Sequence, residues 1–105
     1  MSKTTYHFFF KNLANPLKVD IIVSLNLKPK SVGEIVNDLK VEQSKISHAL
    51  SSLKSCNIVQ VERRGKERFY SLNKDTIIPM LKLIDNHSLK HCKGKCVNCG
   101  ELCRK

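Results

Sequence analysis

The sequence contains no long apolar run. Its most apolar stretches are Phe8 to Phe10 and Ile21 to Val23. A helix needs roughly 20 apolar residues to cross a bilayer, and no secretory leader precedes either stretch. We therefore expect a protein that does not enter the membrane and stays in the cytoplasm.

Acidic residues are scarce. Nine Asp and Glu stand against 19 Lys and Arg, so the formal net charge is +10 over 105 residues. This excess favours a polyanionic partner, either nucleic acid or an anionic lipid surface. The chain has the length of one domain, and its 41% hydrophobic and 27% charged residues are typical of a globular protein.

Catalytic constellations are also lacking. No nucleophile, base and orienting group recur at a recognisable spacing, and none of the four glycines forms a phosphate-cradling loop. The sequence therefore predicts a protein that is not an enzyme.

Two helices are predicted near the N-terminus. Asn15 followed by Pro16 is a typical helix start, because Asn caps free amides and Pro suits the first helical turn. Apolar residues then follow at helical spacing as far as Leu25. Before this helix, Tyr6 to Leu13 indicates a shorter, aromatic-rich helix that we expect to pack on something, such as a second subunit.

A second pair of helices follows. Ser31 and Glu34 have the spacing of a capping box and predict a helix from Val32 to Leu39. After a short turn, apolar residues recur at helical spacing from Ile46, and the opposite face is polar and short of acids. This segment alone fits two alternatives equally well. One is a helix-turn-helix unit, and the other is an ordinary helical hairpin with a solvated polar face. In a helix-turn-helix unit the base-reading face would carry Gln43, Ser44, Lys45, Ser47, His48 and Ser51.

A β-hairpin is predicted next. Residues 59–63 and 68–72 alternate as strands do, and residues 64–67 form the turn between them. A basic hairpin that follows a helix pair favours a DNA-binding wing, which lies along phosphates or enters a minor groove, over a merely solvated hairpin. The basic residues near the tip are Arg63, Arg64, Lys66 and Arg68.

The segment from Asp75 to His91 predicts a last amphipathic helix, with Pro79 tolerable only near its first turn. This helix and the aromatic-rich first helix suit a two-fold dimer interface, which would space two reading helices by roughly 34 to 36 Å, one turn of DNA. The sequence thus predicts a mainly α fold with a β-hairpin wing, a winged helix-turn-helix that dimerises through its N- and C-terminal helices. Residues 1–91 form the DNA-binding and dimerisation domain, and residues 92–105 form a cysteine-rich tail.

Residues from about Phe10 to His87 resemble the ArsR/SmtB family of winged-helix repressors. The resemblance rests on LANPL at residues 13–17, SVGEIVNDL, EQSKISHALSSLKSCNIV and the wing VERRGKERFYSL, in this order and spacing. It implies a homodimeric repressor that binds an inverted-repeat operator in double-stranded DNA and releases it when an effector binds. It also assigns base reading to Gln43, Ser44, Ser47 and His48, and wing contacts to Arg63, Arg64 and Lys66.

The effector sites of the family are not matched as well. Many members carry a cysteine pair in the third helix, where this chain has Glu34 to Val36. Others use carboxylates and histidines of the last helix, of which only His87 remains here. An effector site in this chain is therefore expected elsewhere.

Most of the cysteines lie in the tail. Cys92, Cys96, Cys99 and Cys103 are spaced Cys-x3-Cys-x2-Cys-x3-Cys. Four thiolates suit zinc, with an iron–sulfur cluster as the alternative, whereas a helical face that happens to carry thiols is the plainer interpretation. We expect that a bound metal orders the tail and that the tail senses this metal. If the cysteines bind no cofactor, we expect them to sense thiol oxidation. A purely structural zinc is the alternative.

Two further features of the sequence are a lone cysteine and the possibility of a function other than DNA binding. Cys56 continues the apolar stripe of the reading helix, so it is expected to be a buried structural thiol. The rival from another class is a metal-binding protein-interaction module that keeps the fold but does not read DNA.

Overall fold

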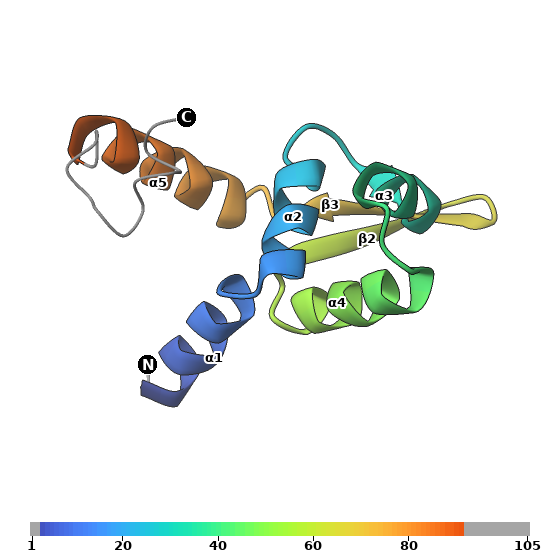
Figure 1. Ribbon diagram of the computed structural model, residues 1–105, viewed down its shortest axis with the longest axis horizontal. Coiled ribbons are helices and arrows are strands. Elements are labelled where there is room, and N and C mark those ends of the chain that lie inside the picture. Colours follow the sequence, from blue (N-terminus) through green and yellow to red (C-terminus); the bar gives the residue numbers. More distant parts are fainter. Residues whose placement is uncertain (1–2, 92–105) are drawn as a thin grey trace. The chain divides into compact units, whose positions relative to one another are not determined.

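The computed structural model describes residues 3–91. Its internal contacts divide the chain into two units, with the boundary between Asn73 and Lys74. The first unit holds the helix pairs and the hairpin, and the second holds the last helix (Figure 1).

The first unit is mainly helical with a small sheet. Its elements, in chain order, are α1 (Lys3–Leu13), α2 (Pro16–Leu25), β1 (Lys30–Ser31), α3 (Val32–Leu39), α4 (Gln43–Ser55), β2 (Val59–Arg64) and β3 (Glu67–Leu72). The bounds of α2 and α3 are those predicted from the sequence, whereas α1 begins three residues earlier than the predicted Tyr6.

Both predicted helix caps are present. The side chain of Asn15 accepts a hydrogen bond from the Lys18 amide at 3.1 Å. Ser31 Oγ accepts from the Glu34 amide at 3.2 Å, and Glu34 Oε1 accepts from the Ser31 amide at 3.1 Å. Each cap satisfies amides that a helix start leaves free, which is why these two bounds could be read from local sequence.

The sheet is antiparallel, with strand order β1-β3-β2. The two-residue strand β1 was not predicted, and it pairs Lys30 with Tyr70 of β3. The prediction of a turn over residues 64–67 was wrong in its bounds, because Arg64 and Glu67 are paired strand residues. Only Gly65 and Lys66 connect the strands, and Gly65 has φ +63°, the left-handed region that a tight hairpin turn needs at its first central residue.

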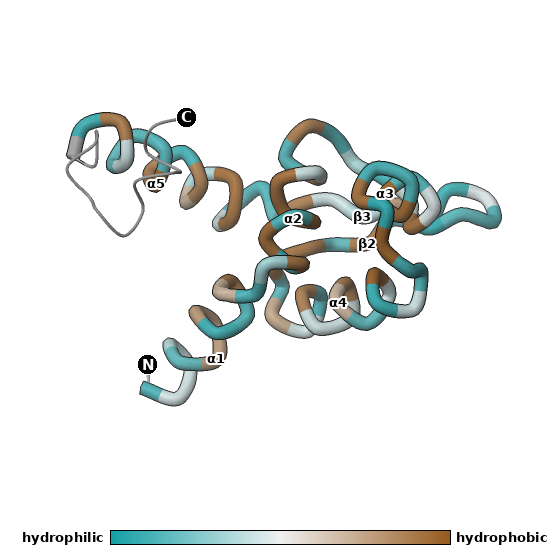
Figure 2. Tube along the Cα trace, viewed as in Figure 1, coloured by the Kyte–Doolittle hydropathy of each residue, from teal (hydrophilic) through white to brown (hydrophobic). Residues whose placement is uncertain are grey.

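The core lies between the helices and the sheet. Ile21 of α2, Ile35 of α3 and Leu50 of α4 are fully buried, together with Val59 and Leu72 of the hairpin. The apolar stripe predicted for α4 is buried, and Figure 2 shows the hairpin tip as hydrophilic by contrast. The core therefore fixes α4 with its polar side outward.

One ion pair beside this core joins a buried lysine to an exposed carboxylate. Lys30 is 6% exposed, and its Nζ donates to Asp38 Oδ2 at 2.6 Å and to Ser24 Oγ at 2.9 Å. The hydrogen bond from Lys30 lowers the pKa of the Asp38 carboxyl below its ordinary value. The pair thus joins β1 to α3 and α2.

The second unit contains α5 (Ile77–His91), which begins two residues later than predicted. Pro79 lies in its first turn, where its missing amide costs little, and the Met80 amide donates to the Thr76 carbonyl at 3.0 Å. Leu83, Ile84 and Leu89 are exposed. None of the helices described is long and apolar enough to span a bilayer.

Candidate nucleic-acid interface

Helices α3 and α4 form a helix-turn-helix unit. Residues 40–42 join them, and Lys40 ends α3 in the left-handed conformation with φ 56°. This conformation turns the chain sharply at a helix end. The β2–β3 hairpin follows α4 directly and extends from the same unit (Figure 1), so the arrangement is a winged helix-turn-helix and the predicted fold class is confirmed.

The outer side of α4 is polar and carries no acid. Ile46, Ala49, Leu50 and Leu53 point into the core, and strongly polar groups occupy the rest of the surface. One of them is already engaged, since Ser44 Oγ donates to Glu42 Oε1 at 2.6 Å. All six predicted base-reading residues are exposed: Gln43, Ser44, Lys45, Ser47, His48 and Ser51.

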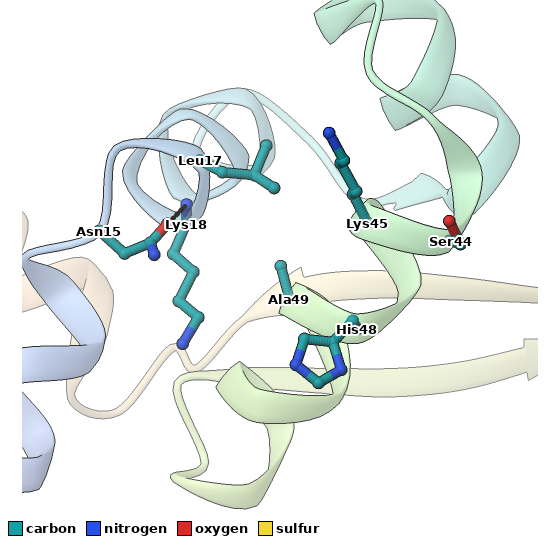
Figure 3. A pocket seen from close by; sticks show the side chains of 7 residues that line it. All are labelled: Asn15, Leu17, Lys18, Ser44, Lys45, His48 and Ala49. Carbon is teal, nitrogen blue, oxygen red and sulfur yellow. Dashed lines mark hydrogen bonds between the residues drawn. The ribbon is translucent and has the colours of Figure 1, made fainter.

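A hollow of about 380 Å³ lies where the start of α4 faces the start of α2. Figure 3 shows Lys45 and His48 projecting from α4, across the hollow from Asn15, Leu17 and Lys18. The Lys18 ammonium is not free for a ligand there, because its Nζ donates to Asn12 Oδ1 at 2.6 Å and to Ser52 Oγ at 2.9 Å. Among the basic residues that line this hollow, Lys45 and His48 are therefore the ones without a side-chain hydrogen bond like those of Lys18.

The four predicted wing cations are all exposed, but the structure does not bring them together. Arg63 lies directly opposite Arg68 in the strand register, and Arg64 lies opposite Glu67. Because neighbouring residues of a strand point to opposite faces, Arg64 lies on the face away from Arg63 and Arg68. Lys66 is in the turn.

Lys54 was not among the residues predicted for the interface. This residue of the last turn of α4 lines a hollow of about 300 Å³ together with Val61, Arg63 and Arg68. The one sequence signal for Lys54 is its position on the polar face of α4, because no sequence motif marks where the end of a helix approaches a strand.

The prediction for Cys56 was wrong. The thiol is half-buried rather than buried, because α4 ends at Ser55 and Cys56 caps it outside the apolar stripe. Its Sγ accepts a hydrogen bond from Asn12 Nδ2 at 3.0 Å and borders a hollow of about 710 Å³.

The predicted metal ligands Cys92, Cys96, Cys99 and Cys103 lie outside the described residues, so the zinc site and the division into residues 1–91 and 92–105 stay predictions. Within the part of the chain that the structure describes, no three His, Cys, Asp or Glu side chains are grouped so that they could hold a metal ion.

Residues 15–61 match the family described as "Bacterial regulatory protein, arsR family". The chain is 34% identical over 74 residues to the uncharacterized HTH-type transcriptional regulator Rv0081 of Mycobacterium tuberculosis, covering 70% of this chain and 65% of that protein. It is 30% identical over 80 residues to the transcriptional repressor SdpR of Bacillus subtilis, covering 72% of this chain and 89% of that protein. The chain thus spans somewhat less than two thirds of the mycobacterial relative and most of the Bacillus one.

Solved structures agree with the sequence relatives. The crystal structure of M. tuberculosis Rv0081 superposes with a TM-score of 0.72 at 30% identity, over 80% of this chain and 84% of that chain. The homodimeric winged helix-turn-helix DNA-binding domain of Mb0332 from Mycobacterium bovis gives a TM-score of 0.71, over 84% of each chain. Because the identity to Mb0332 is 21%, this similarity supports the fold alone. With the fold, the order of its elements and these relatives in agreement, the chain belongs to the ArsR family of bacterial regulatory proteins.

Proposed function

We propose that this protein is a homodimeric transcriptional repressor that binds an inverted-repeat operator through α4 and the wing. The observation that carries the proposal is the polar face of α4, which is exposed, free of acids and flanked by a basic hairpin. A surface of this kind suits a polyanion, and the net charge of +10 favours the same partner.

Base reading is assigned to the first half of α4. A recognition helix enters the major groove with its N-terminal residues against base edges. Gln43, Ser47 and His48 offer both donors and acceptors there, as the groove's base-specific pattern requires. Lys45 adds a positive charge on the same surface.

Dimerisation is assigned to the apolar residues that the described chain leaves uncovered. Tyr6, Phe8 and Phe10 of α1 are 52%, 59% and 61% exposed, and α5 exposes Leu83 and Leu89. A two-fold dimer buries the same surface of both copies and presents two reading helices to successive major grooves.

The test of base reading compares a selected operator with random DNA. The full chain would select its operator from a random duplex library, and affinities would be measured by fluorescence anisotropy at fixed salt. Gln43→Ala or Ser47→Ala should weaken operator binding by roughly 1 to 3 kcal/mol and leave random DNA almost unaffected. Ser55→Ala, on the same helix beyond its reading half, is the matched control and should change neither.

Two results would contradict the assignment. Equal losses on operator and random DNA would remove base reading from these residues. An absence of duplex binding at physiological salt would favour a protein-interaction module in place of a repressor.

We further propose that the tail cysteines Cys92, Cys96, Cys99 and Cys103 form the effector site. The support is chemical: four thiolates make a soft tetrahedral donor set for zinc. A structural zinc site is worth about 10 to 16 kcal/mol of folding energy in small peptides, enough to order a short tail. Without metal, the same thiols would respond to oxidants.

Elemental analysis and an absorption spectrum of anaerobically purified protein would test the tail, followed by operator titration before and after metal removal. One metal per chain whose removal changes operator affinity several-fold is the expected result. Replacing the tail cysteines with Ser should abolish that response, while Cys56→Ser should keep it. Metal with unchanged affinity would make the site structural, and readily formed disulfides without metal would make it a redox switch.

A further inference from the structure

The two faces of the wing carry different charge. Register and strand alternation define an α4 face with Val61, Arg63, Arg68 and Tyr70, and an outer face with Glu62, Arg64, Glu67 and Phe69. Both acids of the hairpin are therefore on the outer face. The α4 face has two arginines and no carboxylate.

Arg64 is engaged on the outer face. Its Nε donates to Glu62 Oε1 at 3.3 Å, and its guanidinium carbon lies 4.9 Å from the centroid of the Phe69 ring. Glu67 is its cross-strand partner. These contacts place Arg64 beside two carboxylates and lay its side chain along the hairpin.

Arg63 and Arg68 have the opposite surroundings. They are directly paired across the strands, and like charges in that position repel each other. They share a hollow of about 300 Å³ with Val61 and with Lys54 of α4. No acid lines this hollow, so the repulsion among its three cations is not relieved by the residues that line it.

We propose that Lys54, Arg63 and Arg68 form a phosphate site in which the recognition helix and the wing hold one stretch of DNA backbone between them, and that Arg64 braces the hairpin without contacting phosphate. A phosphodiester suits this site because guanidinium groups bind phosphate oxygens in a bidentate manner and an ammonium adds a point charge. The anion would also relieve the repulsion between the paired arginines.

This inference rests on the proposed DNA binding and assigns different roles to the basic residues that take part in it. Sequence-based assignment treats Arg63, Arg64, Lys66 and Arg68 as equivalent wing cations. The structure separates Arg64 from the site and adds Lys54.

The test is the salt dependence of binding to a duplex of random sequence, so that no operator is needed. The full chain and four variants, Lys54→Gln, Arg63→Gln, Arg68→Gln and Arg64→Gln, would be titrated by fluorescence anisotropy at several salt concentrations. Each neutralised phosphate contributes about 0.9 to the slope of log affinity against log salt. Each of the first three variants should therefore bind roughly tenfold more weakly and reduce the magnitude of the slope, by at most about 1.

Arg64→Gln is the matched control, since it removes the same charge at the adjacent position and should leave the slope close to that of the unaltered protein. Thermal unfolding of all variants checks folding. Because Arg64 has intramolecular partners, a loss of stability is expected in this control if in any variant, and the three site variants should unfold at the temperature of the unaltered protein.

The outcomes are separable. If the unaltered protein binds duplex DNA and Arg64→Gln lowers the slope as much as Arg63→Gln, the phosphate site is wrong while the DNA-binding function stands. If the three site variants retain the full slope, the site is likewise wrong. If the unaltered protein shows no salt-dependent duplex binding, the proposed function itself fails.

Discussion

At the residue scale, Asn12 connects three helices. The side chain is 7% exposed and uses both ends of its amide. Asn12 Oδ1 accepts from Lys18 Nζ at 2.6 Å and from Ser52 Oγ at 3.0 Å, while Nδ2 donates to Cys56 Sγ at 3.0 Å. One buried polar group thus links α1 to α2 and to the end of α4.

Asn12→Ala should lower the free energy of unfolding by roughly 1 to 3 kcal/mol, because it leaves the hydroxyl of Ser52 and the ammonium of Lys18 short of a partner in a half-buried place. Chemical denaturation would measure the loss. Asn37→Ala, an exposed amide of α3, is the control and should stay within about 0.5 kcal/mol. Equal small effects from both substitutions would show that the cluster does not stabilise the fold.

Neither Asn12 nor Lys30 could be identified from the sequence. Asn12 lies among aromatic and basic residues, and Lys30 follows Pro29 in a segment that indicates only a break between helices. Their burial depends on partners 40 and 8 residues away in the chain, Ser52 and Asp38. No local pattern encodes such a pairing.

At the element scale, the hairpin depends on one backbone conformation. Gly65 has φ +63° and begins the two-residue connection between β2 and β3. An L side chain in this region is strained by about 1 to 2 kcal/mol. The turn therefore favours glycine, and the positions of Arg63 and Arg68 depend on it.

Gly65→Ala should lower the free energy of unfolding by about 1 kcal/mol and weaken duplex binding, although it removes no charge and its Cβ would meet no atom within 4 Å. Gly33→Ala is the control, since its φ is not in the strained range and its nearest neighbour, Ser31 Oγ, is 3.9 Å from the added Cβ. That substitution should be neutral or slightly stabilising. Thermal unfolding and anisotropy titration would compare the two, and an unstrained Gly65→Ala protein would contradict the assignment.

Elements with local start signals were predicted well. Asn15, Ser31 and Glu34 act within a single turn, so their caps set the starts of α2 and α3. The strand β1 was missed because its short segment is a strand only through pairing with β3. The hairpin turn was placed too wide because charged residues suit a turn as well as an exposed strand.

At the scale of the whole molecule, the exposed aromatic residues of α1 predict self-association. Phe8→Glu combined with Phe10→Glu should convert the proposed dimer to a monomer, because it would place charges in the proposed apolar interface. Sedimentation velocity would measure the change in mass, and operator affinity should fall together with it.

Leu27→Glu is the matched control, since Leu27 is 82% exposed in the connection after α2 and lies outside both apolar helices. It should leave the mass and the operator affinity unchanged. A monomeric unaltered protein, or a double variant that stays dimeric, would remove α1 from the interface.

The sequence by itself determined the starts of α2 and α3, the amphipathic α4, the basic hairpin and the family, because each depends on residues within a few positions of one another or on a fixed order of such segments. Only the tertiary structure decided that Arg63 and Arg68 face Lys54 while Arg64 faces Glu62, that Cys56 is half-buried, and that Asn12 bonds to Ser52. The physical reason is that strand register and helix packing set which side of a residue meets a distant part of the chain. In a strand, a change of one position moves a charge to the opposite face.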